Sequence, residues 1–278
     1  MPRPLNDSVY LYGLHDRGGE ATMQGLKTPT SGWVLATEGI GSERNNLSGA
    51  DYSDLASRGL GVIVRLNAGY AGVGALPHAA RYADFAVRCA NFVQASRGAH
   101  IWVVGNEPNH PIEWPGAQWN WDVSPPRPVI EAARGEPILP NRYVDCYRQV
   151  RNAIRALPGH NGDQVLVAGP APWNNLLRYP GNETGDWVVY LRDVLTGLVG
   201  PDRVECDGIA LHTYTHGAQP TLITSAEKLT AAGFTGHHWH FRAYQDFMAV
   251  IPEVMQELPV YITETDQGDI PWQNEKTG

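Results

Sequence analysis

The stretches IWVVGNEPN (101–109) and PVYITETDQG (259–268) share one pattern, a short apolar run that ends in a carboxylate. The first run leads to Glu107 and the second to Glu264. Read as strands with a period of two, the first run places Gly105 and Glu107 on one face. The second run likewise places Ile262 and Glu264 on one face. We therefore expect two buried strands whose ends present glutamates to one shared cleft.

Seven segments of this strand-like kind run through the chain, with helical patterns between them. Several are too continuously apolar for a sheet with one solvated face, which favours parallel strands buried on both faces. Strands that alternate with helices predict repeated β/α units. The strand candidates are residues 9–16, 32–41, 61–67, 101–107, 165–170, 208–214 and 259–265, and the helical patterns are residues 51–59, 78–97, 140–157, 184–199 and 240–257.

The length of the chain suits one barrel. An α/β barrel needs about 250 residues, and the sequence has 278, so we predict a single (β/α)-barrel catalytic domain over residues 1–278. Too few residues follow Glu264 for another helix and strand. The predicted fold is therefore an α/β, (β/α)8 TIM-type barrel that lacks its eighth strand or is truncated before it.

Composition excludes several partners. The net charge of −8, without a cluster of Lys and Arg, argues against nucleic acid. Nowhere do about 18 apolar residues follow one another, so we expect no membrane partner. The start, MPRPLNDSVYLYG, lacks the apolar core of a signal peptide, which predicts a cytoplasmic protein or one whose leader is missing from this sequence. The sequence leaves the oligomeric state open.

Two strand-end glutamates match a specific chemical need. Cleavage of a glycosidic bond passes through an oxocarbenium-like state flanked by two carboxyl groups. One group must be protonated to assist the leaving oxygen, and the other must be ionised to attack carbon or to activate water. Glu107 and Glu264 meet this need if their surroundings separate their pKa values.

The string Asn106-Glu107-Pro108 on the fourth strand, taken with Glu264 on the seventh, resembles clan A of the retaining glycoside hydrolases, the superfamily of cellulase-like and β-xylosidase-like barrels. The resemblance covers about residues 9–268 and rests mainly on these two motifs. It implies a retaining hydrolase that cleaves a β-glycosidic bond by double displacement, with Glu107 as acid/base and Glu264 as nucleophile. It also implies an oligosaccharide, polysaccharide or glycoside substrate and no cofactor.

The resemblance assigns roles to further residues. It implies that Asn106 hydrogen-bonds the sugar 2-hydroxyl and that Tyr214 orients the nucleophile. His212 shares a strand face with Tyr214, and we expect it to bind a sugar hydroxyl. Arg65, at the end of the third strand, is expected to hold Glu264 ionised, because a nearby cation lowers a carboxyl pKa. A plain salt bridge is the alternative for Arg65.

Tryptophans and two acidic residues complete the candidate set. Exposed aromatic rings at strand ends can stack on the apolar face of a sugar. Asp16 ends the first strand, where a sugar contact and a hydrogen-bonded pair with His15 are equally plausible. Glu38 is a third strand-end carboxylate, for which we favour a structural or substrate contact. The tryptophans expected to bind substrate are Trp114, Trp121, Trp173 and Trp272.

Three other functions stay open at this stage. The first is a barrel that binds carbohydrate without cleaving it, since catalysis needs carboxylates held to about 0.5 Å and the eighth strand is missing from the pattern. Transglycosylation would use the same residues with a sugar as acceptor. A metal-dependent hydrolase is suggested by His237, His238 and His240, with His212 and His216 upstream. These histidines lack the usual ligand spacing, so we expect no metal.

Overall fold

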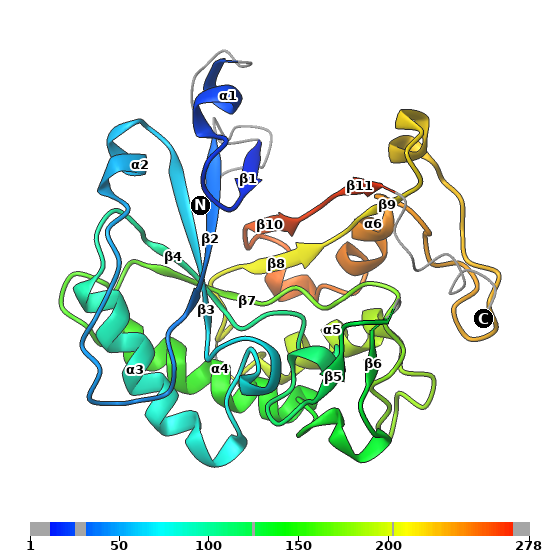
Figure 1. Cartoon of the computed structure of the whole chain (residues 1–278), viewed down its shortest axis with the longest axis horizontal. Coiled ribbons are helices and arrows are strands. Elements are labelled where there is room, and N and C mark those ends of the chain that lie inside the picture. Colours follow the sequence, from blue (N-terminus) through cyan, green and yellow to red (C-terminus); the bar gives the residue numbers. More distant parts are fainter. Residues whose placement is uncertain (1–11, 26–31, 124–125, 202, 269–278) are drawn as a thin grey trace.

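The computed structural model describes residues 12–25, 32–123, 126–201 and 203–268. Within them, seven parallel strands follow one another in chain order and curl into a nearly closed (β/α) barrel (Figure 1). This is the predicted TIM-type barrel short of its eighth strand. The strands are β1 Gly13–His15, β2 Trp33–Gly39, β3 Gly61–Asn67, β4 Ile101–Val104, β7 Gln164–Val167, β8 Ile209–His212 and β10 Val260–Glu264.

The middle strands are buried on both faces, as their continuous apolar runs predict. In β3 every residue from Val62 to Asn67 is buried, and all four residues of β8 are buried. The sheet therefore needs helices outside it and side chains inside it. A charged residue, Arg65, lies among the buried residues of β3 and belongs to the site described below.

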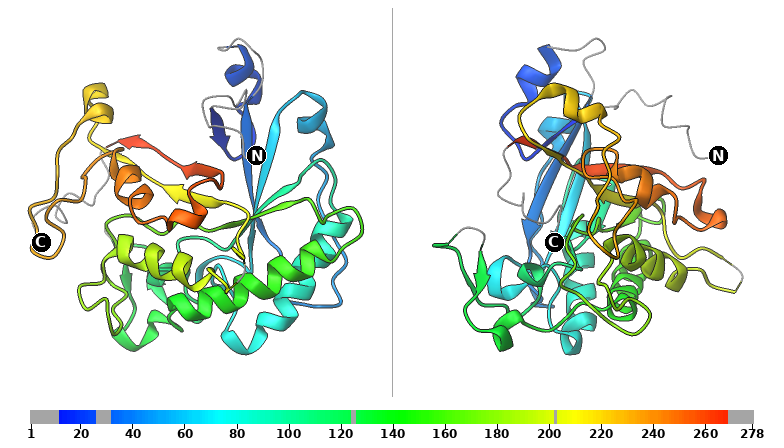
Figure 2. Two further views of the ribbon diagram at one scale, coloured as in Figure 1. Left: turned by 180° about the vertical axis from the view of Figure 1, so that it is seen from behind. Right: turned by 90° about the vertical axis from the view of Figure 1, so that its right-hand side faces the viewer.

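The helices cover the outside of the sheet unevenly. The three longer ones, α3, α4 and α5, lie side by side along one flank (Figures 1 and 2). The predicted helix at 240–257 is shorter in the structure, because Pro252 precedes a separate 3-10 turn, η7 Glu253–Met255. The helices are α1 Glu20–Gly25, α2 Ser53–Ser57, α3 Tyr82–Ala95, α4 Pro140–Arg155, α5 Trp187–Gly197 and α6 Ala243–Met248.

The long connection after β4, residues 108–139, has structure of its own. Its two 3-10 turns flank a small antiparallel pair of strands. These elements are η4 Pro111–Glu113, β5 Trp119–Asn120, β6 Arg127–Pro128 and η5 Glu131–Arg134. A second pair of short strands, β9 Thr215–His216 and β11 Gln267–Gly268, extends the ends of β8 and β10.

In the part of the chain that the structure describes, no strand joins β1 to β10, and the barrel is open there. A cavity of about 510 Å³ lies at this seam, lined among others by Leu14, Trp33 and Ile262. Ile262, two residues before Glu264 in β10, is 41% exposed although it belongs to a barrel strand. The rings of Trp33 and Tyr261 meet edge to face with centroids 5.5 Å apart, which brings β2 and β10 together. No helix of the described residues is long and apolar enough to cross a bilayer.

Candidate active site

Glu107 reaches the site from a turn and not from a strand. The strand β4 ends at Val104, and Gly105 follows with φ of 80°. The predicted alternation of Gly105 and Glu107 on one strand face is therefore wrong, because the chain leaves the sheet at the glycine. Glu107 itself has φ of 35°, which is rare for a residue other than glycine. Such strained positions cluster at functional sites.

Glu264 is the last residue of β10, as predicted. It aligns with His212 of β8 after an irregularity in register between Ile262 and Glu264. Its carbonyl accepts a hydrogen bond from the Thr213 backbone N–H at 3.1 Å. A register shift of this kind re-aims a side chain at the end of a strand.

The two glutamates meet above the barrel. One carboxylate oxygen of Glu107 lies within 4.8 Å of one of Glu264. The Tyr214 hydroxyl lies between them, 2.7 Å from Glu264 Oε2 and 3.3 Å from Glu107 Oε1. The expected contact of Tyr214 with Glu264 is therefore present. Burial raises the pKa of Tyr214, and the two carboxylates raise it further, so this hydroxyl keeps its proton.

Positively charged and hydrogen-bonding groups surround Glu264. Arg65 Nη1 lies 2.6 Å from Oε1 of Glu264, and His15 Nε2 lies 3.3 Å from the same oxygen. Burial alone raises the pKa of Glu264, but His212, His15 and Arg65 outweigh it and hold the pKa well below its usual range. The expected pairing of Arg65 with Glu264 is present, and this carboxylate is ionised at neutral pH.

His212 occupies a different place from the one expected. Its side chain is 1% exposed, so it cannot face a sugar directly. Its Nδ1 lies 2.9 Å from Glu107 Oε1, and its Nε2 lies 3.3 Å from Arg65 Nη2. His212 therefore links the two carboxylates to Arg65 and fixes their positions from below.

The atoms of Glu107, His212 and Glu264 are also close enough together to ligate a metal ion. The guanidinium of Arg65 already contacts Glu264 Oε1, and a fixed positive charge at 2.6 Å disfavours a divalent cation at that oxygen. The arrangement therefore suits acid–base and nucleophilic chemistry better than metal binding.

A third carboxyl group, which the sequence analysis missed, lies beside the pair. Glu113 belongs to η4, and its Oε1 accepts a hydrogen bond from Asn106 Nδ2 at 3.1 Å. Burial raises the pKa of Glu113 to about 7, and the charge of Glu107 contributes. The buried Oδ1 of Asn106 has no hydrogen-bond partner among the described residues. The only sequence signal for Glu113 is its place in the long connection that leaves Glu107.

The tryptophans divide into buried and exposed rings. Trp114 and Trp173 are 3% and 7% exposed, and each donates its indole N–H to a backbone carbonyl, of Pro108 and His238. The expected exposure of these two rings is not found, because both belong to the hydrophobic core. Trp121 is 57% exposed, so much of its ring is accessible to solvent. Trp272, which is also expected to bind substrate, lies outside the described residues.

The other strand-end residues have partners of their own. Asp16 Oδ2 lies 3.2 Å from His15 Nδ1, so His15 connects Asp16 to Glu264. The expected pair of Asp16 with His15 is thus present, and the side chain of Asp16 is exposed. Glu38 accepts a hydrogen bond from the Tyr52 hydroxyl at 2.8 Å, which gives it a structural contact.

The run of histidines does not converge on one point. The three rings contact three different carboxylates, with distances of 2.8, 2.8 and 3.2 Å. None of these contacts involves the pair of glutamates. The pairs are His237 with Asp186, His238 with Asp246 and His240 with Glu227.

No protein-family model and no curated protein matches this sequence. Among solved structures, the chain is similar to a Paenibacillus polymyxa xyloglucanase of glycoside hydrolase family 44, at 13% identity and a TM-score of 0.41, over 77% of this chain and 51% of that one. It is also similar to a fungal β-1,4-galactanase (13% identity, TM-score 0.41, 84% and 76% covered). A third is the Trichoderma harzianum β-glucosidase (12% identity, TM-score 0.45, 88% and 65% covered). The chain thus spans about half the length of the xyloglucanase.

Proposed function

We propose that this protein is a retaining glycoside hydrolase that cleaves a β-glycosidic bond, with Glu107 as acid/base and Glu264 as nucleophile. The observation that carries the proposal is the approach of their carboxylate oxygens to within 4.8 Å in unlike surroundings. Retaining enzymes hold these groups about 5–5.5 Å apart, whereas inverting enzymes leave about 6.5–9.5 Å for a water. The spacing favours direct attack by a carboxylate.

In the first step, Glu264 attacks the anomeric carbon while the bond to the leaving oxygen breaks. Arg65 and Tyr214 keep Glu264 ionised and orient its carboxylate toward the anomeric carbon. Glu107 gives its proton to the leaving oxygen. The products are a glycosyl ester on Glu264 and the released alcohol. Glu107 is now a carboxylate and is ready to act as a base.

In the second step, Glu107 takes a proton from water as the water oxygen attacks the anomeric carbon. The ester bond breaks, and Glu264 leaves as a carboxylate, which restores both groups. A sugar hydroxyl in place of water would give transglycosylation with the same residues. We assign Asn106 to the sugar 2-hydroxyl because the residue directly precedes Glu107, is partly exposed and donates through Nδ2 to Glu113. Trp121 and Asp16 are candidate contacts for more distant parts of the substrate.

One observation favours a second candidate, a barrel that binds carbohydrate without cleaving it. Among the described strands, the seam between β1 and β10 leaves one side of the site without a neighbour, which weakens the support that catalysis needs. The hydrogen bonds and ion pairs on Glu264 oppose this reading. His15 of β1 reaches across the seam to that carboxylate at 3.3 Å, so the site is supported from both edges.

The test is hydrolysis of a panel of 4-nitrophenyl β-glycosides by the wild type, Glu264→Gln and Glu38→Gln. Glu38→Gln is the matched control, because Glu38 also ends a strand but contacts Tyr52. We expect turnover in the wild type and the control, loss in Glu264→Gln, and no effect of EDTA. Substrate binding by Glu264→Ala should stay within about tenfold of the wild type, since the other sugar contacts persist.

Other outcomes would select the alternatives. Sugar binding without turnover in the wild type would favour the carbohydrate-binding barrel. Loss of activity in EDTA, with recovery on adding zinc, would favour a metal-dependent hydrolase.

A further inference from the structure

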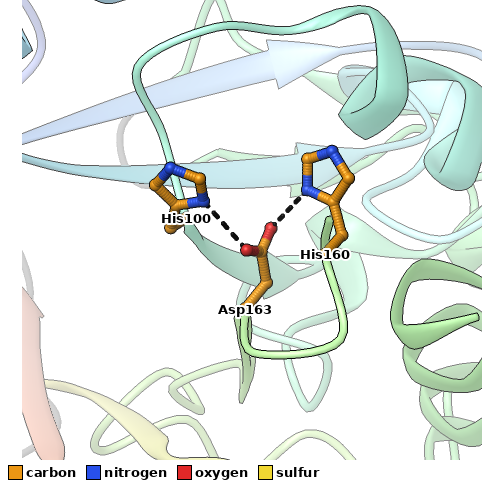
Figure 3. Close-up of side chains that lie close together, drawn as sticks. All are labelled: His100, His160 and Asp163. Carbon is orange, nitrogen blue, oxygen red and sulfur yellow. Dashed lines mark hydrogen bonds and ion pairs between the residues drawn. The ribbon is translucent and has the colours of Figure 1, made fainter. Parts of the chain in front are cut away.

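Two histidines and an aspartate meet at the opposite end of the barrel strands from the glutamate pair. His100 directly precedes β4, and Asp163 directly precedes β7. His160 lies in the turn that leads into β7. Figure 3 shows both imidazole rings directed at one carboxylate, with His100 Nδ1 2.9 Å from Oδ1 and His160 Nδ1 2.8 Å from Oδ2.

The carboxylate at the centre of this cluster is fixed from behind. The indole N–H of Trp102, a fully buried residue, donates to Asp163 Oδ2 at 2.7 Å. The backbone holds the histidines as well, since Gln164 N–H donates to the His100 carbonyl at 2.9 Å and Asp163 N–H donates to the His160 carbonyl at 3.1 Å. Little conformational entropy would be lost in bringing these groups together.

We propose that His100, His160 and Asp163 form a binding site for one divalent transition-metal ion of the zinc(II) type. One atom from each of the three residues lies within 4.8 Å of the others, so small side-chain shifts bring all three onto one ion. Two imidazoles and a carboxylate are a donor set that zinc takes in proteins, with water in the open position. The site is separate from the proposed catalytic pair and does not depend on it.

Burial and hydrogen bonding suit this role. Asp163 is buried, whereas the side chain of His100 is 71% exposed and leaves a path for the ion from solvent. Each ring would carry its proton on Nε2 and turn the Nδ1 lone pair to the metal. The hydrogen bond from Trp102 would persist as support behind the metal-bound carboxylate.

Charge distinguishes this cluster from the one formed by Glu107, His212 and Glu264. In the described part of the chain, no arginine or lysine forms an ion pair with Asp163, whose ion-pair partners are the two histidines. A metal here would tie the turn before β7 to the start of β4. The four residues of β4 separate it from the catalytic end by about 13 Å.

The test is calorimetric titration of the metal-stripped full chain with ZnCl₂ at pH 7.5, using the wild type, His100→Asn, His160→Asn and His78→Asn. The last is the control, because His78 forms a similar pair with a single carboxylate, Glu136, at 2.7 Å. We expect one zinc per chain in the wild type and the control, and at least about tenfold weaker binding in the other two.

Thermal unfolding gives a second readout. Zinc should raise the Tm of the wild type and the His78→Asn control but not that of His100→Asn, and glycoside turnover should be the same in all three. His100 is mostly exposed, so its replacement tests the site without disturbing the core.

Three outcomes would overturn the proposal. The first is zinc binding to the wild type that is no tighter than millimolar, and the second is zinc binding to His100→Asn and His160→Asn that is as tight as to the wild type. The third comes from the same titration made with Glu264→Gln: binding that survives both histidine substitutions but is lost in this variant would place the ion at the glutamate pair. Any of these results would leave Asp163 as a hydrogen-bond acceptor only.

Discussion

At the scale of single residues, the site gives two identical side chains unlike surroundings. Glu264 contacts Arg65 and His15, and it accepts a hydrogen bond from Tyr214. Glu107 has no arginine contact in the described structure and touches His212 and Tyr214 instead. In the proposed function, these contacts keep the nucleophile Glu264 ionised, whereas Glu107, the proposed acid, lacks such a cation among the described residues.

The proposed role of Glu107 as acid predicts a dependence on the leaving group. Glu107→Ala should slow substrates with poor leaving groups far more than activated aryl glycosides, because only the former need a proton on the departing oxygen. The measurement is kcat/KM for alkyl and 4-nitrophenyl glycosides of one sugar. Equal losses on both substrates would contradict the assignment.

Glu113 predicts an effect on the pH profile. Its carboxyl, with a pKa of about 7, becomes charged beside Glu107 in the range where turnover is measured. A negative neighbour disfavours loss of a proton from an acid, so Glu113→Gln should move the alkaline limb of the kcat/KM profile to lower pH. The control is Glu131→Gln, an exposed residue of the same connection. An unchanged alkaline limb in Glu113→Gln would show that the charge of Glu113 does not influence proton loss from the acid.

At the scale of elements, the strand ends decide where the reactive groups lie. The chain turns out of β4 at Gly105 and continues through the strained backbone of Glu107, whereas a register irregularity in β10 aims Glu264. Local apolar runs were enough to predict all seven barrel strands. They could not reveal the turn at Gly105, because a single glycine also fits within a strand.

Gly105→Ala tests this turn. A Cβ there would come within 2.9 Å of Leu76 Cδ2, and φ of 80° suits glycine. We expect a loss of about 1–2 kcal/mol in the free energy of unfolding from the backbone conformation alone, with a fall in kcat as Glu107 shifts. Gly25→Ala is the control, since no atom of the described residues lies within 4 Å of a Cβ added there, and it should change stability by less than about 0.5 kcal/mol. A stable, fully active Gly105→Ala would contradict the account.

At the scale of the whole molecule, the site joins parts of the chain that are far apart in sequence. Arg65 and Glu264 are 199 positions apart, and their contact was expected only through the resemblance to a known clan. The resemblance also led to Tyr214. It did not predict the burial of His212 or Trp114, because the burial of a side chain at a strand end or in a long connection depends on packing that local patterns do not encode.

The ion pairs on Glu264 predict how stability depends on pH. The pKa of Glu264 is lower in the folded chain than its ordinary value of 4.5. Its contribution is therefore present above about pH 4.5 and is lost as the pH falls toward the folded pKa. Urea unfolding between pH 7 and 3 should show a steeper acid loss for the wild type than for Glu264→Gln. Glu257→Gln, at an exposed position, should follow the wild type, and identical slopes in all three would contradict this prediction.

The most direct test of the central claim is mass spectrometry of the protein after incubation with activated 2-deoxy-2-fluoro β-glycosides of several sugars. The fluorine slows the second step, so a retaining enzyme accumulates its glycosyl ester. We expect the mass of one sugar on the peptide that contains Glu264, and none in Glu264→Gln. Turnover of ordinary glycosides without any labelled peptide, or a label on another residue, would contradict the double displacement through Glu264.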